Sequence, residues 1–102
     1  MLQLRPTCEH CNTKLPAHSN QAFICSFECT FCLSCIEDFI GLVCPNCGGE
    51  LIKRPIRPAQ NRKNGNCLLY YPASKKIVHK PKNKPAHLQF RKQMQVIAPE
   101  FR

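Results

Sequence analysis

"ECTFCLSC", residues 28–35, places three cysteines, Cys29, Cys32 and Cys35, at intervals of three residues. Such a run can be a redox device, half of an iron–sulfur motif, or parts of two different metal sites. The choice decides the fold, because eight of the nine cysteines lie within the 40 residues from Cys8 to Cys47. A stretch of this length buries too little apolar surface to fold alone and usually needs disulfides, metals or partners.

Disulfides are the poorer explanation. The N-terminal residues MLQLRP have neither the basic nor the apolar region of a secretory signal, and no apolar run approaches the roughly 18 residues of a membrane span. We therefore expect a cytoplasmic protein without membrane association. Thiols stay reduced in that compartment, where clustered C-x-x-C pairs are typical of metal ligands or redox pairs.

The charge divides the chain into two parts. Residues 1–52 carry two cationic residues against five carboxylates, a net −3, whereas residues 53–102 carry thirteen against one, a net +12. Eight thiolates that bind two divalent cations would bring the N-terminal part to about −7. Six of the nine prolines lie from Pro55 onward with lysines between them, a composition that rarely builds a core. We predict a two-metal domain over residues 1–56 and a largely disordered, basic Pro/Lys-rich tail over residues 57–102.

Short elements of secondary structure can be predicted between the cysteines. "AFICSF" (22–27) is apolar and favours a strand, and "ELIK" (50–53) could be a final strand. "LSCIEDFI" (33–40) has apolar residues at helical spacing, and Gly41 follows as a stop. In the tail, "HLQFRKQMQVI" (87–97) could be a helix with an apolar docking face or a strand.

The cysteine spacing is C-x2-C-x13-C-x3-C-x2-C-x2-C-x8-C-P-x-C, which supplies two sites of four ligands each. In an interleaved arrangement, site 1 is Cys8, Cys11, Cys32 and Cys35, and site 2 is Cys25, Cys29, Cys44 and Cys47. A sequential division into residues 8–29 and 32–47 is the alternative. The predicted helix favours interleaving, because Cys32 and Cys35 would project from its first turn, where the helix macrodipole stabilises thiolates. The expected cofactors are two structural Zn²⁺ ions.

This interleaved spacing is similar to that of the RING finger, in which a proline usually follows the seventh ligand, as Pro45 does here. The usual fourth ligand of that family is histidine, whereas this chain has Cys29. LIM domains share the C-x2-C-x2-C centre but have a longer gap than the one between Cys35 and Cys44. The resemblance implies a small α+β zinc-stabilised domain of RING-like or treble-clef type.

A closer resemblance covers residues 2–58. The segments "LRPTCEHC", "ICSFECTFC" and "CPNCGGELIKRPIRP" are similar to a family of short bacterial cysteine-rich proteins known only as a domain of unknown function. This resemblance implies a bacterial cytosolic protein and brings no assigned activity.

We expect a non-catalytic zinc-binding protein that acts as a small macromolecule-recognition module. A site of four thiolates is closed, unlike catalytic zinc with its open position, and no residue set suggests an enzyme or a small-molecule substrate. One alternative is an iron–sulfur protein for electron transfer or redox sensing, because "CTFCLSC" followed by "CP" resembles the ferredoxin run. A ubiquitin-ligase-like enzyme is a weaker alternative, since His10 and Gly48 replace residues typical of ligase RING fingers.

The basic tail can be interpreted either as a segment without a binding role or as a binding segment. It could be a solvated segment, or it could bind an acidic protein surface, including the acidic domain of its own chain. It could also bind nucleic acid, with Tyr70, Tyr71 and Phe90 available for base stacking. The candidate nucleic-acid-binding residues are Arg62, Lys63, Lys75, Lys76, Lys80, Lys82, Lys84, Arg91 and Lys92. The partner is thus expected to be a protein or a nucleic acid, while the four histidines and Cys67 are not expected to bind metal.

Overall fold

Three short antiparallel strands form the centre of the metal domain, residues 1–56. The computed structural model describes residues 1–102, and its strands are β1 (Ala22–Ile24), β2 (Thr30–Cys32) and β3 (Ile52–Lys53). β1 is the middle strand, with Ile24 opposite Thr30 of β2 on one side and opposite Ile52 of β3 on the other. The sheet therefore joins the segment before the triple cysteine run and the first part of that run to the end of the domain.

The predicted helix over residues 33–40 is confirmed, although its second half is wider than an α-helix. α1 (Leu33–Cys35) continues directly into η1 (Ile36–Ile40), a π-helical turn closed by a hydrogen bond of 2.9 Å from the Gly41 N–H to the Ile36 carbonyl. Ile36, Phe39 and Ile40 are buried, as the apolar spacing predicts. Gly41 ends the helix with a positive φ of 63°, a conformation that favours glycine.

The predicted strands exist but are shorter than their apolar runs. β1 ends at Ile24 because Cys25 begins a tight turn, in which the Glu28 N–H donates to the Cys25 carbonyl and Glu28 adopts a φ of 69°. β3 covers only the last two residues of the run 50–53. The turns that carry the cysteines therefore include residues whose side chains alone would favour a strand.

Thiols make up a large part of the core. Six of its thirteen buried residues are cysteines, and the others are Leu15, Ala22, Phe31, Ile36, Phe39, Ile40 and Leu51. Seven aliphatic and aromatic side chains are few for an independent domain, which agrees with the need for metal ions.

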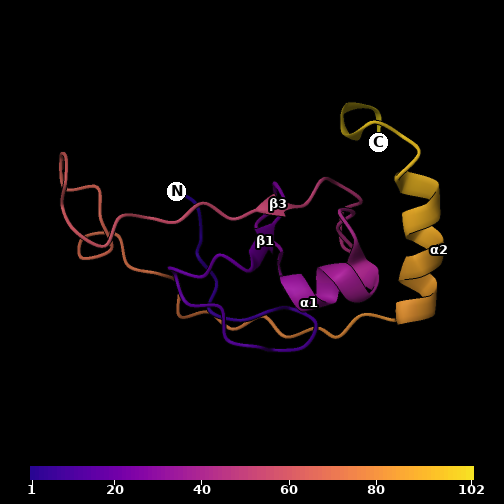
Figure 1. Ribbon diagram of the computed structural model, residues 1–102, viewed down its shortest axis with the longest axis horizontal. Helices are drawn as coiled ribbons and strands as arrows, with labels where there is room; N and C mark the ends of the chain where they lie inside the picture. The colour runs from indigo at the N-terminus through magenta and orange to yellow at the C-terminus, as the bar shows by residue number, and fades with distance from the viewer.

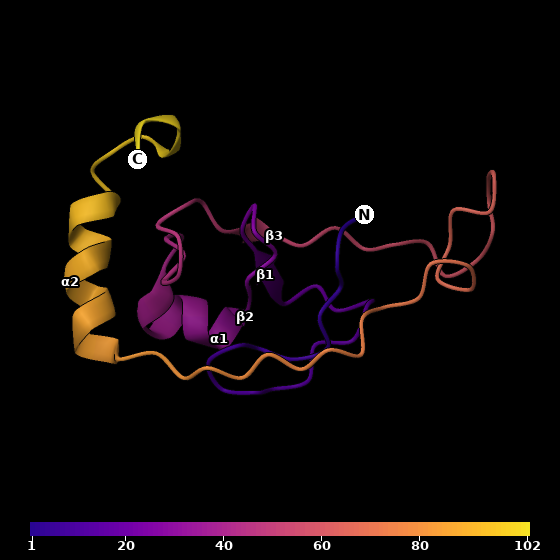
Figure 2. The ribbon, with the colours of Figure 1, turned by 180° about the vertical axis from the view of Figure 1, so that it is seen from behind.

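The expected disorder of the basic Pro/Lys-rich tail is wrong. Residues 57–102, called the basic arm below, leave the metal domain as a loop, return along its edge and end in α2 (Lys84–Met94) and η2 (Pro99–Phe101). α2 packs against η1, and Figures 1 and 2 show it standing beside the helical turn at the end of the molecule opposite to the loop. Two of its lysines pair with carboxylates of residues 1–56, Lys82 with Glu9 and Lys84 with Asp38.

α2 docks onto the end of η1 through one of its histidines and one of its arginines. His87 is buried, its Nε2 lies 2.8 Å from the Ile40 carbonyl oxygen, and Arg91 Nη1 donates to the Phe39 carbonyl at 3.3 Å. The last carbonyls of a helix have no partner within the helix, and hydrogen-bond donors or cations stabilise them. α2 begins at Lys84, earlier than the run 87–97 suggests, because the Asn83 side chain accepts a hydrogen bond from the Ala86 N–H and caps it.

The apolar side of α2 is directed at the metal domain rather than left free. A side chain at Gly48 would place its Cβ 3.0 Å from Phe90 Cζ and 3.6 Å from the sulfur of Met94. The docking face expected on this helix thus has the last cysteine turn of the same chain as its partner. None of the helices has the length and the apolar character needed to cross a membrane.

Candidate metal centres

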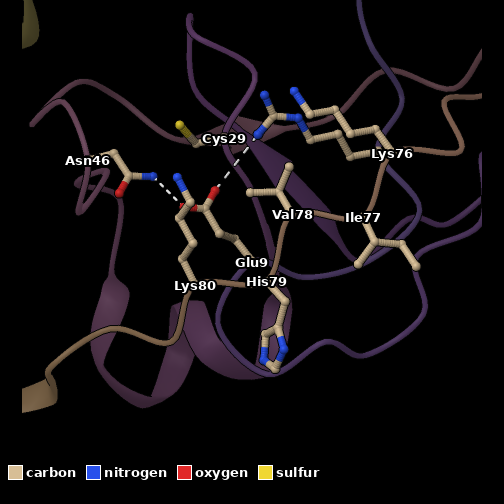
Figure 3. Close-up of a pocket in the computed structure, with 9 residues that line it drawn as sticks. Glu9, Cys29, Asn46, Lys76, Ile77, Val78, His79 and Lys80 are labelled. Atoms are coloured by element: carbon tan, nitrogen blue, oxygen red, sulfur yellow. Dashed lines mark hydrogen bonds and ion pairs between the residues drawn. The ribbon is translucent and has the colours of Figure 1, made fainter.

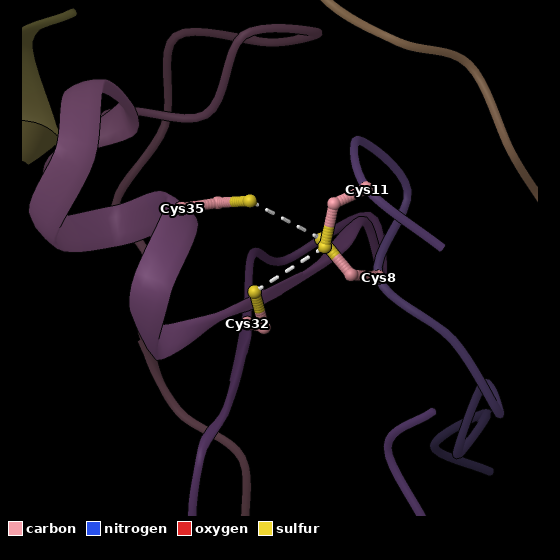
Figure 4. Close-up of side chains that lie close together, drawn as sticks. All are labelled: Cys8, Cys11, Cys32 and Cys35. Atoms are coloured by element: carbon pink, nitrogen blue, oxygen red, sulfur yellow. Dashed lines mark hydrogen bonds between the residues drawn. The ribbon is translucent and has the colours of Figure 1, made fainter. Parts of the chain in front are cut away.

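Four thiols converge at the first centre, and Figure 4 shows them pointing toward one another. The sulfurs of Cys8, Cys11, Cys32 and Cys35 all lie within 4.8 Å of one another. Cys8 Sγ is 3.8 Å from Cys35 Sγ, and Cys11 Sγ is 3.6 Å from Cys32 Sγ. An ion with tetrahedral Zn–S bonds of about 2.3 Å places its ligand sulfurs about 3.8 Å apart, so these sulfurs can hold one such ion.

The local sequence explains how the four thiols meet. Cys8 and Cys11 lie on a turn closed by hydrogen bonds of 3.0 Å from the Asn12 N–H to the Cys8 carbonyl and 2.9 Å from the Cys8 N–H to the Thr13 carbonyl. Asn12 has a φ of 63°, which asparagine tolerates better than most residues. Cys32 ends β2 and precedes α1, while Cys35 is the last residue of α1, so the start of the helix supplies the other two ligands.

The second centre joins the turn after β1 to the final cysteine turn. The sulfurs of Cys25, Cys44 and Cys47 lie within 4.8 Å of one another. Cys29 stands outside this set of three, although the Cys25 N–H donates to its carbonyl at 3.2 Å and hydrogen bonding with the Cys44 thiol lowers its pKa. Cys29 therefore lies beside the group of three and remains the predicted fourth ligand of the second centre.

Backbone N–H groups point at the sulfurs of the second centre. The Phe27 N–H donates to Cys25 Sγ at 3.3 Å, the Asn46 N–H to Cys44 Sγ at 3.4 Å, and the Gly49 N–H to Cys47 Sγ at 3.3 Å. Such donors stabilise a thiolate over a thiol. Gly48 permits this turn because it adopts a φ of 76°.

The surroundings shift the pKa values of six thiols in these groups, two downward and four upward. Burial raises the pKa of Cys25 to about 11 and raises the pKa of Cys32 and of Cys35. The hydrogen bond between Cys44 and Cys29 lowers the pKa of Cys29 to about 5 and raises that of Cys44. At Cys11 burial acts to raise the pKa, but hydrogen bonds with Thr13 outweigh it and lower the value to about 7. A bound cation would replace the remaining protons and stabilise all the thiolates together.

The thiols that lie together in the structure are grouped as in the interleaved division, not as in the sequential one. Cys32 and Cys35 lie with Cys8 and Cys11, whereas Cys25 lies with Cys44 and Cys47. The triple run therefore spans both clusters, with Cys29 at the second and the other two at the first. Cys67 is buried but lies outside both clusters.

Glu9, between the two cysteines of the first turn, is the residue that sequence analysis missed. It is 3% exposed, and its Oε1 accepts hydrogen bonds of 2.7 Å from Asn46 Nδ2 and from Lys82 Nζ. Arg5 Nη1 lies 3.8 Å from its Oε2. Glu9 therefore connects the first cysteine turn, the last cysteine turn and the basic arm, and nothing in the sequence signals a contact across 73 residues.

A cavity of about 660 Å³ opens beside Glu9 and the second centre. Figure 3 shows Glu9 with Cys29, Asn46 and the arm residues 76–80 around it. Arg5, Lys76 and Lys80 contribute cations to its walls and Glu9 contributes a carboxylate, so the charges that line the cavity are mostly positive. These cations lie near the second cluster, where they would offset part of the negative charge of four thiolates around a divalent ion.

The candidate nucleic-acid-binding residues fall into two groups. Three of them contact the metal domain: Lys82 pairs with Glu9, Lys84 pairs with Asp38 at 2.9 Å, and Arg91 binds the Phe39 carbonyl. The other six are exposed and form no ion pair: Arg62, Lys63, Lys75, Lys76, Lys80 and Lys92. Among the histidines, His18 is exposed, whereas His10 accepts a hydrogen bond from the Lys82 N–H and packs edge-on against Phe39.

The fold and the clusters define a small α+β protein whose cysteines could bind two metal ions. Residues 1–57 match the family described as "Protein of unknown function (DUF1272)", and the chain belongs to this family. It is also 54% identical over 81 residues to "Uncharacterized protein R02474" of Rhizobium meliloti (strain 1021), which covers 79% of this chain and 89% of that protein. The 81 aligned residues exceed the 57 of the family match by 24, so the similarity continues into the basic arm. No solved structure matches the chain.

Proposed function

We propose that the two clusters hold structural Zn²⁺ ions in a RING-like, interleaved arrangement, and that the protein is a non-catalytic module for macromolecule recognition. The spacing of the sulfurs is the observation that carries the first part. Separations of 3.6 and 3.8 Å match the edge of a tetrahedron around one ion. A four-thiolate site has no open position for a substrate, which supports a structural role.

The same spacing argues against the iron–sulfur alternative. A cluster of several iron and sulfide atoms separates its cysteine ligands more widely than a single ion does, because the ligands bind different iron atoms. The first group of sulfurs, all within 4.8 Å, leaves room for one ion only. A single iron ion could occupy such a site, and the colour of an iron–thiolate protein would distinguish it from zinc.

The docked arm argues against a ubiquitin-ligase-like role. A ligase RING offers an apolar groove between its first cysteine turn and its helix. Here the Lys82 N–H donates to His10 Nδ1 at 2.9 Å, and α2 packs on η1 beside it. The arm therefore covers the surface that such a partner would need.

The recognition part rests on the charge that remains exposed after the arm has docked. Six exposed lysine and arginine side chains of the arm form neither an ion pair nor a side-chain hydrogen bond, and the arm contains no carboxylate side chain before Glu100. Cations of one sign gathered on a surface attract polyanions. None of these cations belongs to a group of thiols, so zinc would shape the domain while the arm makes the contact.

The structural role of zinc can be tested with two matched substitutions of buried cysteines. Cys35→Ser removes a thiol of the first cluster, and Cys67→Ser removes a buried thiol outside both clusters. We expect Cys35→Ser to lower the zinc content from two ions to one or none and to unfold the domain, because metal binding and folding are coupled. Cys67→Ser should keep two ions and a dispersed NMR spectrum. A folded Cys35→Ser protein with its full metal content would contradict the proposal.

A further inference from the structure

The loop with which the basic arm begins has a defined shape. We call residues 57–72 the projecting loop, and Figures 1 and 2 show it extending from the end of the molecule opposite to α2. Its base is fastened by Arg57, whose Nη1 donates to the Tyr71 carbonyl at 2.6 Å and whose Nη2 donates to the Leu2 carbonyl at 2.8 Å. The Leu68 N–H closes the base with a bond of 2.9 Å to the Pro58 carbonyl. Compact loops whose ends are joined in this way are often functional.

The interior of the loop is also held by specific contacts. Asn61 Oδ1 accepts a hydrogen bond of 2.8 Å from the Gly65 N–H, and Asn64 and Gly65 both adopt a positive φ, as in a tight turn. Cys67 is fully buried although the loop projects from the domain, and its carbonyl accepts a bond from the Tyr71 N–H. These contacts therefore fix the course of the backbone from which the outer side chains project.

Those outer side chains are aromatic and cationic. Tyr70 is 62% exposed and Tyr71 is 41% exposed, although tyrosine rings usually bury most of their surface. A Cβ at Gly65 would lie 3.6 Å from Tyr70 Cδ2, so one edge of this ring rests on backbone rather than on another side chain. Arg62 and Lys63 are exposed on the same loop.

Cations continue from the loop along the edge of the domain. Lys75 and Lys76 are exposed at the start of the extended segment that leads to α2, and neither forms an ion pair. The sequence between Glu50 and Glu100 contains no carboxylate side chain. A ligand that lies across the loop and this segment would therefore meet cations and aromatic rings and no carboxylate of either segment.

We propose that the projecting loop and the adjoining lysines bind single-stranded nucleic acid, which gives the recognition role proposed above a specific ligand class. Tyr70 and Tyr71 stack on unpaired bases, while Arg62, Lys63, Lys75 and Lys76 contact phosphates. Exposed aromatic rings beside cations favour a single strand over a duplex, because a duplex offers phosphates but keeps its base faces stacked on one another. An acidic protein would offer negative charge but no exposed base faces on which the tyrosines could stack. DNA and RNA strands share this chemistry.

The test is fluorescence anisotropy with the full zinc-loaded chain and labelled 20-nucleotide oligothymidine and oligouridine, beside a duplex of the same length and vesicles of anionic phospholipid. We expect both single strands to bind more tightly than the duplex and the vesicles. Tyr70→Ala and Tyr71→Ala should each weaken binding by about 5- to 150-fold, the range given by base–aromatic stacking, and Tyr70→Phe should restore it. Lys75→Ala with Lys76→Ala should reduce the slope of log K against log salt by about 1.4.

Phe27→Ala is the matched control, because Phe27 is an aromatic residue 70% exposed on the metal domain, outside the loop. Each variant is compared only after its zinc content and NMR dispersion match the parent chain. Binding that the tyrosine substitutions do not change, or stronger binding to the duplex or the vesicles, would overturn the inference. If the folded chain holds two zinc ions but binds no single strand, only the nucleic-acid inference is overturned. If the chain holds no zinc, the proposed function itself is overturned.

Discussion

Arg54 provides the most demanding test of how the domain is held together. It is 1% exposed, forms no ion pair, and donates to three backbone carbonyls of the N-terminal segment. Nη1 donates to the Arg5 carbonyl at 2.8 Å, and Nη2 donates to the Leu15 and Pro16 carbonyls at 3.3 and 3.1 Å. Burial lowers the pKa of this guanidinium, but an arginine keeps its charge. The side chain thus fixes residues 5–16, which carry the first cysteine turn, to the end of β3.

The cost of losing Arg54 can be worked from these contacts. In Arg54→Met, the Pro16 carbonyl keeps a second donor, the Ser19 N–H at 2.8 Å, whereas the Arg5 and Leu15 carbonyls lose their donor. Each buried carbonyl without a partner costs about 1–3 kcal/mol. Removal of a buried charge returns part of this cost, because its desolvation is no longer needed. We expect a net loss of about 2–5 kcal/mol in the free energy of unfolding.

The assay is urea unfolding followed by circular dichroism at a fixed, buffered concentration of free zinc, since metal binding and folding are coupled. Lys53→Met is the control, because Lys53 is the exposed neighbour of Arg54 and donates no hydrogen bond from its side chain. Arg54→Lys should be nearly as damaging as Arg54→Met, because one ammonium group cannot reproduce the fork that reaches separate carbonyls. A methionine variant as stable as the parent would refute the reasoning, since the carbonyls would then have found other partners.

Two further substitutions examine the contact between the metal domain and the basic arm. Gly41→Ala should lower the free energy of unfolding by about 1–3 kcal/mol, because φ 63° with ψ −151° is a glycine conformation. The new Cβ would also lie 2.5 Å from Arg91 Nε. Urea unfolding of the double variant Gly41→Ala/Arg91→Ala separates this steric clash from the backbone strain. If Gly41→Ala were as stable as the parent, both explanations would be contradicted. Glu9→Gln leaves Lys82 without its carboxylate in a site where the lysine side chain is 13% exposed. Faster hydrogen exchange is expected in residues 80–94 than in the parent, with Glu37→Gln as an exposed control, and unchanged exchange would show that the ion pair does not hold the arm.

The sequence was most informative where covalent spacing and helical periodicity act locally. Cys32 and Cys35 can reach one ion because they lie three positions apart at the start of a helix, and Gly41 ends that helix because φ 63° with ψ −151° is a glycine conformation. The extent of β1 was overestimated, because Cys25 bends the chain to reach the second cluster. Local propensity does not contain that constraint.

The order of the basic arm could not be predicted from its composition. Proline and lysine argue against a core of its own, and the arm indeed has none. It is ordered by single contacts with distant residues: Lys82 with Glu9, His87 with the Ile40 carbonyl, and Phe90 over Gly48. Each of these is a pairing across tens of residues, which the pattern of either segment alone does not specify.

Metal content is the measurement that tests the central claim most directly. The chain should be purified without oxygen, analysed for zinc and iron by elemental analysis, and recorded between 300 and 700 nm. The account predicts about two zinc ions per chain and no visible absorbance, because each group of thiolates fits one tetrahedral ion. Iron with a visible chromophore, or a folded chain without metal, would contradict it.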